Sequence, residues 1–168
     1  MPPAFTLVEL MIAILLLALL TSAVALSFSG RLKAARSRDS LEQLRSFDAT
    51  ARQFSMRYSR AVQIVFDLSA NTLARREGAN DDVARCQVSW PTGYWVDEVR
   101  IGNQLYANGE AASVGISPLG IGPTYAVRLR GPDYDQWIVS AGLTGIMTPV
   151  KDESTVAMLL SRATGAVR

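Results

Sequence analysis

The chain has 168 residues, a formal net charge of +2 and almost half of its residues apolar. This length allows one modest domain plus an anchor, and so small a charge does not by itself argue for a nucleic-acid partner. Histidine is absent and Cys86 is the single cysteine, which removes an intramolecular disulfide, a Cys/His zinc site and a histidine general base. An enzyme is not excluded by this composition, but its commonest tools are missing, and with the rest of the sequence we expect a non-catalytic protein without a cofactor or a bound metal.

The apolar residues concentrate in a nearly unbroken run over residues 10–26, interrupted only by Thr21 and Ser22. One interpretation is a cleaved secretory signal peptide with a small-residue cleavage site at residues 23–25. Two observations disfavour a signal peptide: no lysine or arginine precedes the apolar run, and Glu9 lies directly before it. A second interpretation is a plain transmembrane anchor over residues 5–28, which would form about 36 Å of helix. That interpretation leaves Glu9 unexplained, because a carboxylate inside a membrane needs a partner.

A third interpretation accounts for the acid. The segment Phe5-Thr6-Leu7-Val8-Glu9-Leu10, followed by Met11-Ile12-Ala13-Ile14, resembles the N-terminal motif of type IV pilins and type II secretion pseudopilins. The resemblance implies that a prepilin peptidase cuts between Ala4 and Phe5 and that the new amine of Phe5 is methylated. It also implies that Glu9 meets the terminal ammonium of a neighbouring subunit inside an apolar helix bundle, where only the correct stagger satisfies both charges.

The flanks of the run differ from the family in two ways. The leader, residues 1–4, carries no charge and ends in alanine, where the family usually has glycine. We therefore expect the natural start codon to lie upstream and to add basic residues. Arg31, Lys33, Arg36 and Arg38 follow the run, and the positive-inside rule alone would leave the C-terminal domain in the cytoplasm. The family implies the opposite orientation, a single-pass inner-membrane protein with a periplasmic domain, and we follow the family.

Helical periodicity continues beyond the apolar run. Apolar residues recur at three- and four-residue steps, namely Leu41, Leu44, Phe47, Ala51, Phe54 and Tyr58. The sequence predicts one helix from about residue 5 to residue 60. The expected organisation is a leader (1–4), a transmembrane helix (5–28), its continuation (29–60), an antiparallel β domain (61–151) and a C-terminal tail (152–168) that forms a short amphipathic helix.

Strand patterns fill the rest of the chain. Alternating apolar and polar residues predict strands at 62–68, 85–90, 95–101, 125–130, 137–141 and 146–150, and residues 71–73 are expected to form the turn into a further strand that ends at 75–76. Residues 77–82 are expected to form a loop, and 111–123, rich in glycine and proline, a loop or a bulged strand. No helix separates these strands, so the sheets should be antiparallel. The predicted fold class is α+β, with one long helix packed on one or two antiparallel sheets.

The C-terminal half carries a second resemblance. Gly120, Tyr125-Ala126-Val127-Arg128-Leu129, Trp137-Ile138-Val139 and Leu143-Thr144-Gly145 are similar in order and spacing to the end of the GspH/FimT branch of minor pseudopilins and pilins. The resemblance implies a minor subunit that assembles through its N-terminal helix into the pseudopilus of a type II secretion system. Its implied partners are other pilin or pseudopilin subunits, the prepilin peptidase, an inner-membrane assembly platform and the ATPase of that platform.

Several motifs have weaker functional interpretations. Residues 115–122 resemble a phosphate-binding loop but lack its Lys-Ser/Thr and open no predicted helix, so a turn is expected. Asp81, Asp82, Asp133 and Asp135 lack the spacing of a calcium loop. Asp97 and Glu98 should point to opposite faces of a strand, which disfavours a catalytic pair. The alternation places Cys86 either in the core or at a solvated position, with a buried, inert thiol as the default.

Basic residues support an alternative function. Some FimT-like minor pilins bind DNA through basic residues near the C-terminus, and the resemblance extends this to candidate contacts at Arg128, Arg130, Lys151, Arg162 and Arg168. Asp152 and Glu153 dilute this charge, and Arg128 and Arg130 share a strand face that is usually just solvated. DNA binding for uptake is therefore the alternative function, behind filament assembly.

Overall fold

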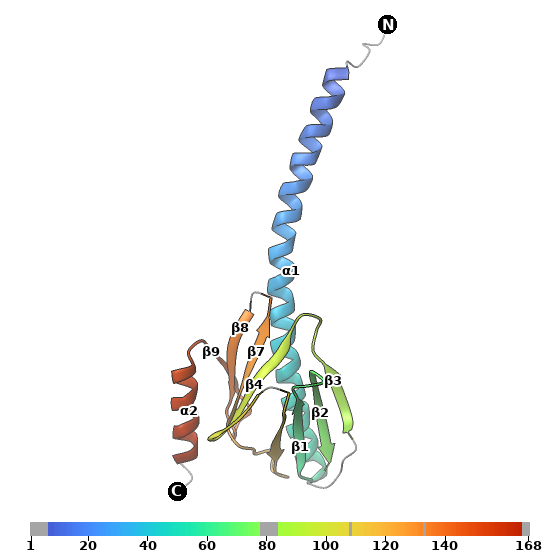
Figure 1. The fold of residues 1–168 in the computed structure, drawn as a ribbon. Helices are drawn as coiled ribbons and strands as arrows, with labels where there is room; N and C mark the ends of the chain where they lie inside the picture. Colours follow the sequence, from blue (N-terminus) through green and yellow to red (C-terminus); the bar gives the residue numbers. More distant parts are fainter. Residues whose placement is uncertain (1–6, 78–83, 108, 133, 166–168) are drawn as a thin grey trace. The chain divides into compact units, whose positions relative to one another are not determined.

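The structure is a computed structural model that describes residues 7–77, 84–107, 109–132 and 134–165, and for residues 23–34 it describes the backbone alone. The chain divides into two compact units, Met1–Arg38 and Asp39–Arg168. The expected fold class is confirmed in its main features, because a long N-terminal helix is combined with antiparallel sheets (Figure 1).

Helix α1 spans Leu7–Tyr58. Its length agrees with the sequence, because no proline interrupts it and Gly30 is its sole glycine. The helix ends where Ser59 adopts a left-handed conformation with a φ of 51°. The amide of Arg60 then donates to the carbonyl oxygen of Ser55 at 3.1 Å. The helix thus ends close to residue 60, as expected, whereas its expected start lies outside the described residues.

The first sheet has four antiparallel strands in the order β3-β2-β1-β6, namely β1 Val62–Asp67, β2 Thr72–Glu77, β3 Ala84–Ser89 and β6 Ala111–Ile116. Of residues 111–123, which were expected to form a loop or a bulged strand, residues 111–116 form the regular strand β6 and the rest form the loop that follows it. Ala112, Val114 and Ile116 of β6 are buried, and the strand pairs along its whole length with β1. Alanine, serine and glycine occupy the exposed face of β6, which obscured the alternation in the sequence.

The second sheet has five antiparallel strands in the order β5-β4-β7-β8-β9, namely β4 Trp95–Ile101, β5 Gln104–Tyr106, β7 Tyr125–Gly131, β8 Tyr134–Ser140 and β9 Met147–Val150. Strand β5 was not anticipated, because three residues are too few to show a period of two. The pairing of β4 with β7 shifts between Val96 and Glu98, which marks a β-bulge.

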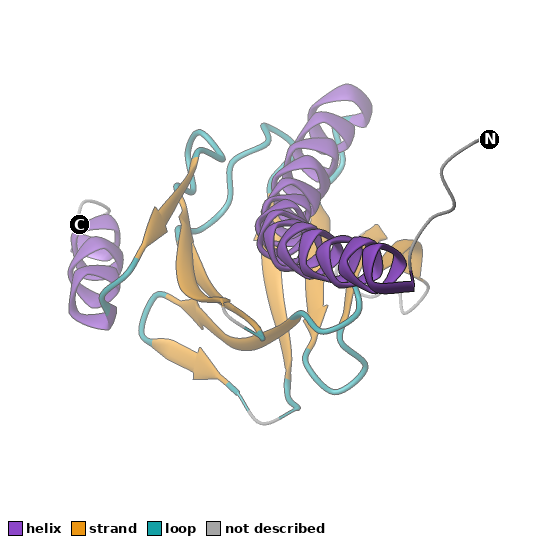
Figure 2. Ribbon diagram, turned by 90° about the horizontal axis from the view of Figure 1, so that it is seen from above, coloured by secondary structure: helices purple, strands orange, loops and turns teal. Residues whose placement is uncertain are grey.

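One core joins the helix and the inner faces of both sheets. From α1, Leu44, Phe47 and Ala51 enter this core, as the helical stripe predicted. Helix α2, Glu153–Gly165, covers the outer face of the second sheet, where Val156 and Leu160 pack in a separate cluster with Ala126, Trp137 and Val139. Figures 1 and 2 show α2 beside β9 and β8, on the side away from the first sheet.

A buried ionic cluster fastens α1 to two loops of the second unit. Arg52 Nε donates to Asp48 Oδ2 at 2.6 Å, and both side chains are almost fully buried. Arg52 Nη1 donates to the carbonyl oxygens of Gly120 at 2.9 Å and Gly142 at 2.7 Å. The hydroxyl of Tyr125 donates to Asp48 Oδ1 at 2.9 Å. Burial, followed by the charge of Asp48, raises the pKa of Tyr125, so this hydroxyl stays a donor.

Candidate functional site

The first unit contains a stretch of α1 whose large apolar side chains are all exposed. Each of them is at least 54% exposed, and they are Leu7, Val8, Leu10, Met11, Ile12, Ile14, Leu15, Leu16, Leu17, Leu19 and Leu20. Successive helix positions point about 100° apart, so this apolar surface surrounds the helix. A helix that is apolar on every side is buried in a membrane or among other elements when it functions.

Glu9 is the one ionisable residue among residues 7–22. It lies in the first turn of α1 and is exposed. The amide groups at a helix N-terminus favour a carboxylate there, which suits an acid at this end of the apolar stretch. The expected processing residues, Ala4 and Phe5, lie outside the described residues. The described part of the site is thus an apolar helix with an acid in its first turn.

Thr21 and Ser22, the two polar residues of the apolar run, bond to their own helix. The hydroxyl of Ser22 donates to the carbonyl oxygen of Ala18 at 2.9 Å, and that of Thr21 donates to the carbonyl oxygen of Leu17. Such bonds let hydroxyl groups enter an apolar environment.

Among the residues that the structure describes, no helix has the length and apolar character that crossing a membrane requires.

Two candidate DNA contacts are held by carboxylates on the outer face of β7. Arg128 lies 2.9 Å from Glu98 and 2.8 Å from Asp135, and Arg130 lies 3.1 Å from Asp97. The hydrogen bonds from Arg128 lower the pKa of the Asp135 carboxyl, and the same bonds raise the pKa of the guanidinium. These contacts neutralise much of the positive charge that DNA would meet.

The other candidate DNA contacts lie elsewhere in the chain. Lys151 follows β9 and is exposed, and Arg162 lies exposed in the last turn of α2. Arg168 lies outside the described residues.

Asp97 and Glu98 contradict the expectation that adjacent carboxylates of a strand point to opposite faces. Both contact arginines on the same outer face of β7, Asp97 meeting Arg130 and Glu98 meeting Arg128. The β-bulge in β4 explains this, because an extra residue breaks the alternation of side chains. Each carboxylate is thereby bound in an ion pair.

The glycine-rich segment at residues 115–122 ends β6 and forms a turn. The amide of Gly120 donates to the carbonyl oxygen of Ser117 at 2.8 Å, and Gly120 has a φ of 75°. No group of three acidic, histidine or cysteine side chains suited to a metal occurs among the described residues. Asp81, Asp82 and Asp133 lie outside those residues.

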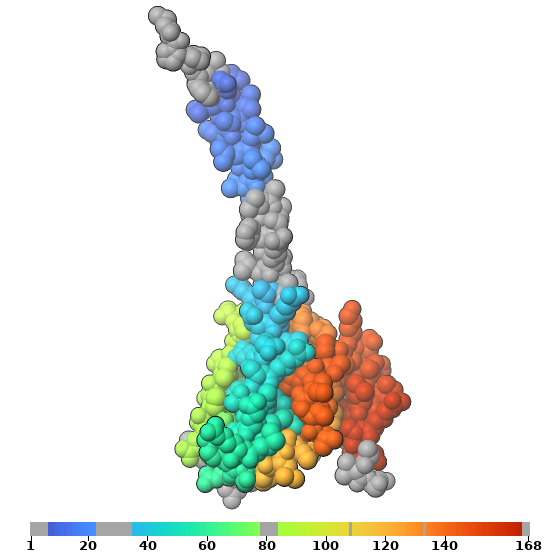
Figure 3. Space-filling view, turned by 180° about the vertical axis from the view of Figure 1, so that it is seen from behind, coloured from blue at the N-terminus to red at the C-terminus, as the bar shows by residue number. Residues whose placement is uncertain are grey.

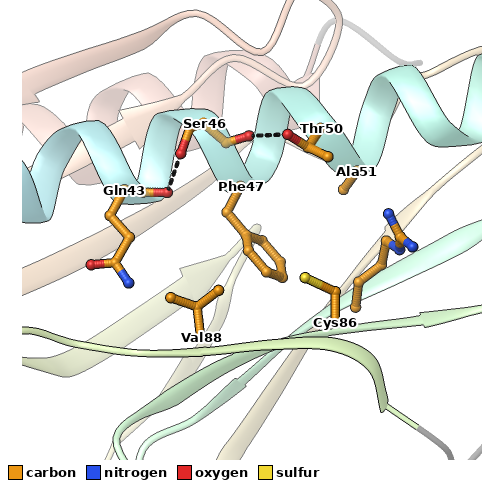
Figure 4. A pocket seen from close by; sticks show the side chains of 8 residues that line it. Gln43, Ser46, Phe47, Thr50, Ala51, Cys86 and Val88 are labelled. Carbon is orange, nitrogen blue, oxygen red and sulfur yellow. Dashed lines mark hydrogen bonds between the residues drawn. The ribbon is translucent and has the colours of Figure 1, made fainter.

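Cys86 is exposed, so of the two positions that the alternation left open the solvated one is correct and the default of a buried thiol is wrong. It lies on β3, which is an edge strand of the first sheet among the strands that the structure describes. Its side chain faces a largely apolar groove of about 290 Å³ between α1 and the first sheet (Figure 4). The groove is lined by Gln43, Ser46, Phe47, Thr50, Ala51, Arg75, Cys86 and Val88.

Sequence reasoning missed two features of the structure, the buried pair of Asp48 and Arg52 and the exposed apolar side chains of two loops. The spacing of Asp48 and Arg52 was a detectable signal, but such pairs are common on solvated helix faces. Exposed apolar side chains also occur in the loops before β7 and β9, for example Leu119 and Leu143. A leucine next to a glycine in a loop was the signal there.

No known family model and no curated protein sequence matches the chain. Among solved structures, two of the minor pseudopilin EpsH from the type II secretion system of Vibrio cholerae are similar. The first has a TM-score of 0.53 and 9% identity, and the match covers 70% of this chain and 97% of the EpsH chain. The second has a TM-score of 0.52 and 8% identity, and the match covers 68% of this chain and 95% of the EpsH chain. The type IV minor pilin FimU of Pseudomonas aeruginosa matches with a TM-score of 0.46 and 12% identity over 70% of this chain and 89% of FimU. The two EpsH matches show that the chain has a pilin-like fold of the minor-pseudopilin type.

Proposed function

We propose that this chain is a minor pseudopilin or pilin subunit that assembles through its N-terminal helix into the pseudopilus of a type II secretion system. The observation that carries the proposal is the apolar surface around residues 7–20, with Glu9 in the first helical turn. The EpsH-like fold of the same chain supports it.

Before assembly, residues 5–28 span the inner membrane once and the second unit lies in the periplasm. A helix of that length, about 36 Å, covers a hydrocarbon core of about 30 Å. Its polar interruptions at Thr21 and Ser22 bond to the helix backbone, so they add little cost. On assembly, the apolar surface transfers from lipid to a bundle of neighbouring helices.

Glu9 provides the register of that bundle. Cleavage between Ala4 and Phe5 by the prepilin peptidase frees an amine, which is then methylated. A lone charged carboxylate at the centre of a bilayer costs roughly 2.5–3.5 kcal/mol on insertion scales. Glu9 lies near the helix end, where the cost is smaller, but it still gains from an ammonium partner on a neighbouring subunit. Only one axial stagger brings the two charges together, so the pair selects that stagger.

The energy for assembly comes from partners. The glycine-rich segment of this chain forms a turn and lacks the Lys-Ser/Thr of a nucleotide-binding loop. We assign the supply of energy for assembly to the inner-membrane platform and its ATPase. Other pilin or pseudopilin subunits are the neighbours of this chain in the filament. The DNA-uptake alternative gains no support from Arg128 and Arg130, because carboxylates already hold both.

A fractionation experiment in cells that carry the assembly system tests the proposal. The wild-type chain should occur in the membrane fraction and in filaments sheared from the cells. Glu9→Val should insert in the membrane but be largely absent from the filaments. Ile14→Val, an apolar change in the same stretch, is the matched control and should assemble normally. Recovery of Glu9→Val in filaments at the wild-type level would show that the carboxylate does not set the register.

A further inference from the structure

The second unit exposes an apolar surface around the two loops that Arg52 holds. We call it the loop patch, and it consists of Met56 from α1, Leu119 and Ile121 from the loop after β6, and Leu143 and Ile146 from the loop after β8. Every member is at least 40% exposed, and Leu119 and Leu143 are 75% and 73% exposed. The outward position of the two leucines contrasts with the burial of the aliphatic residues on the neighbouring strands.

The segments that carry the loop patch touch one another. The amide of Gly122 donates to the carbonyl oxygen of Gly142 at 3.0 Å, which joins the two loops. Gly120 lies against α1 so closely that a Cβ there would come within 2.9 Å of Met56 Cγ. Figure 3 shows the gold and orange parts of the chain, which include these loops, beside the cyan and teal part of α1. The three segments that carry the patch are therefore in contact with one another.

The loops are held in place rather than loosely attached. Arg52 Nη1 bonds to one carbonyl oxygen in each loop, at Gly120 and Gly142. The hydroxyl of Ser55 donates to the carbonyl oxygen of Ser117, at the start of the first loop. Because these bonds fix the backbone beforehand, a partner that binds here meets a small ordering cost.

The segments that carry the loop patch are basic. Residues 53–60, 117–124 and 141–149 contain two basic residues, Arg57 and Arg60, and no acidic residue. Both arginines are exposed. Complementary charge would thus be carboxylates that flank apolar side chains on the partner.

The size of the patch indicates which partner it fits. The five side chains present on the order of 500 Å² of apolar surface, at the upper end for a monomer. A stable, independent interface buries about 800 Å² on each partner, so this surface alone is too small for a dimer of the chain. It suits a contact between molecules that are already held side by side, where a high effective concentration supplies the rest.

We propose that the loop patch binds an adjacent, different pilin-like subunit in the same filament, through apolar side chains of that subunit flanked by carboxylates. The proposal rests on the proposed function and names the surface of the second unit that serves it. It also assigns a role to Arg52, which positions the loops without touching the partner.

Site-specific photo-crosslinking in cells tests this surface. A photoreactive amino acid replaces Leu143, and in the matched control it replaces Leu105, which is 51% exposed on the opposite edge of the second sheet. Leu143 should yield an adduct in which mass spectrometry identifies a second pilin-like subunit, and Leu105 should not. Leu119→Asp, at an exposed position, should lower the adduct yield by about tenfold or more without lowering the thermal stability of the chain. The combined change Arg57→Glu and Arg60→Glu should also lower the adduct yield, because it removes the positive charge beside the patch.

Three results would overturn the assignment of the surface. They are adducts with copies of the same chain only, no adduct at all, and equal adduct yields from the Leu143 and Leu105 positions. The sheared filament fraction separates this failure from failure of the proposed function. If the chain enters filaments but gives one of those three results, the loop patch is not the contact and the assembly function stands. If the wild-type chain never enters filaments, both proposals are wrong.

Discussion

Replacement of Arg52 by methionine should strongly destabilise the second unit. Methionine fills a similar volume but donates no hydrogen bond, so the bonds to Asp48, Gly120 and Gly142 are all lost. Asp48, which is 1% exposed, then keeps only Tyr125 among the partners described above. A buried carboxylate without its cation is the main source of the expected loss.

The size of the effect follows from that burial. Removal of one partner of a buried ion pair typically costs about 3–5 kcal/mol. For a unit of this size, each kcal/mol lowers the melting temperature by about 3 °C, which gives a fall of about 9–15 °C. Arg52→Lys should lower the stability less than Arg52→Met, because lysine keeps the positive charge beside Asp48. Some loss should remain, because an ammonium cannot reach all three acceptors as a guanidinium does.

Thermal unfolding of the full chain in detergent micelles, followed by tryptophan fluorescence, measures this effect. Arg57→Met is the matched control, since Arg57 is an exposed arginine on the same helix, and it should leave the melting temperature unchanged. The double variant Asp48→Leu, Arg52→Met should be more stable than Arg52→Met alone, because it no longer buries a lone carboxylate. A loss below about 1 kcal/mol for Arg52→Met would refute this account of the cluster.

Three further predictions concern other parts of the second unit. Leu160→Ala should destabilise the packing of α2 on the second sheet by about 2–4 kcal/mol, measured by urea unfolding, since Leu160 is 3% exposed. Hydrogen bonds from Arg128 lower the pKa of Asp135, so the ionised carboxylate stabilises the fold above about pH 4. That contribution is lost as the pH falls through the lowered pKa, and acid unfolding of Asp135→Asn should lack it. Cys86 should be modified by a maleimide in the folded chain without prior unfolding, and protection would contradict its exposure.

Regular patterns of the sequence predicted most of the fold. The stripe at Leu44, Phe47 and Ala51 identified the buried face of α1, because helical spacing and burial coincide there. Strand β4 also occupies the residues expected of it, Trp95–Ile101. In these segments local propensity and tertiary packing favour the same structure, which makes them readable from sequence.

Features that depend on distant contacts could not be predicted in this way. Strand β6 is defined by its pairing with β1, although its own composition indicates a loop. The burial of Arg52 depends on two loops that lie far away in the sequence. The bulge that turns Asp97 and Glu98 to one face arises from the register between β4 and β7. In each case the deciding interaction joins segments whose proximity only the folded chain creates.

The central claim is that the apolar part of α1 is a processed assembly helix in which Glu9 meets a neighbour's N-terminal amine. Mass spectrometry of the N-terminal peptide, from the chain purified out of membranes of cells that carry the prepilin peptidase, tests it most directly. The account predicts a peptide that begins with N-methylated Phe5. Recovery solely of peptides in which Ala4 still precedes Phe5 would contradict the account, because no free amine would then exist for Glu9 to meet.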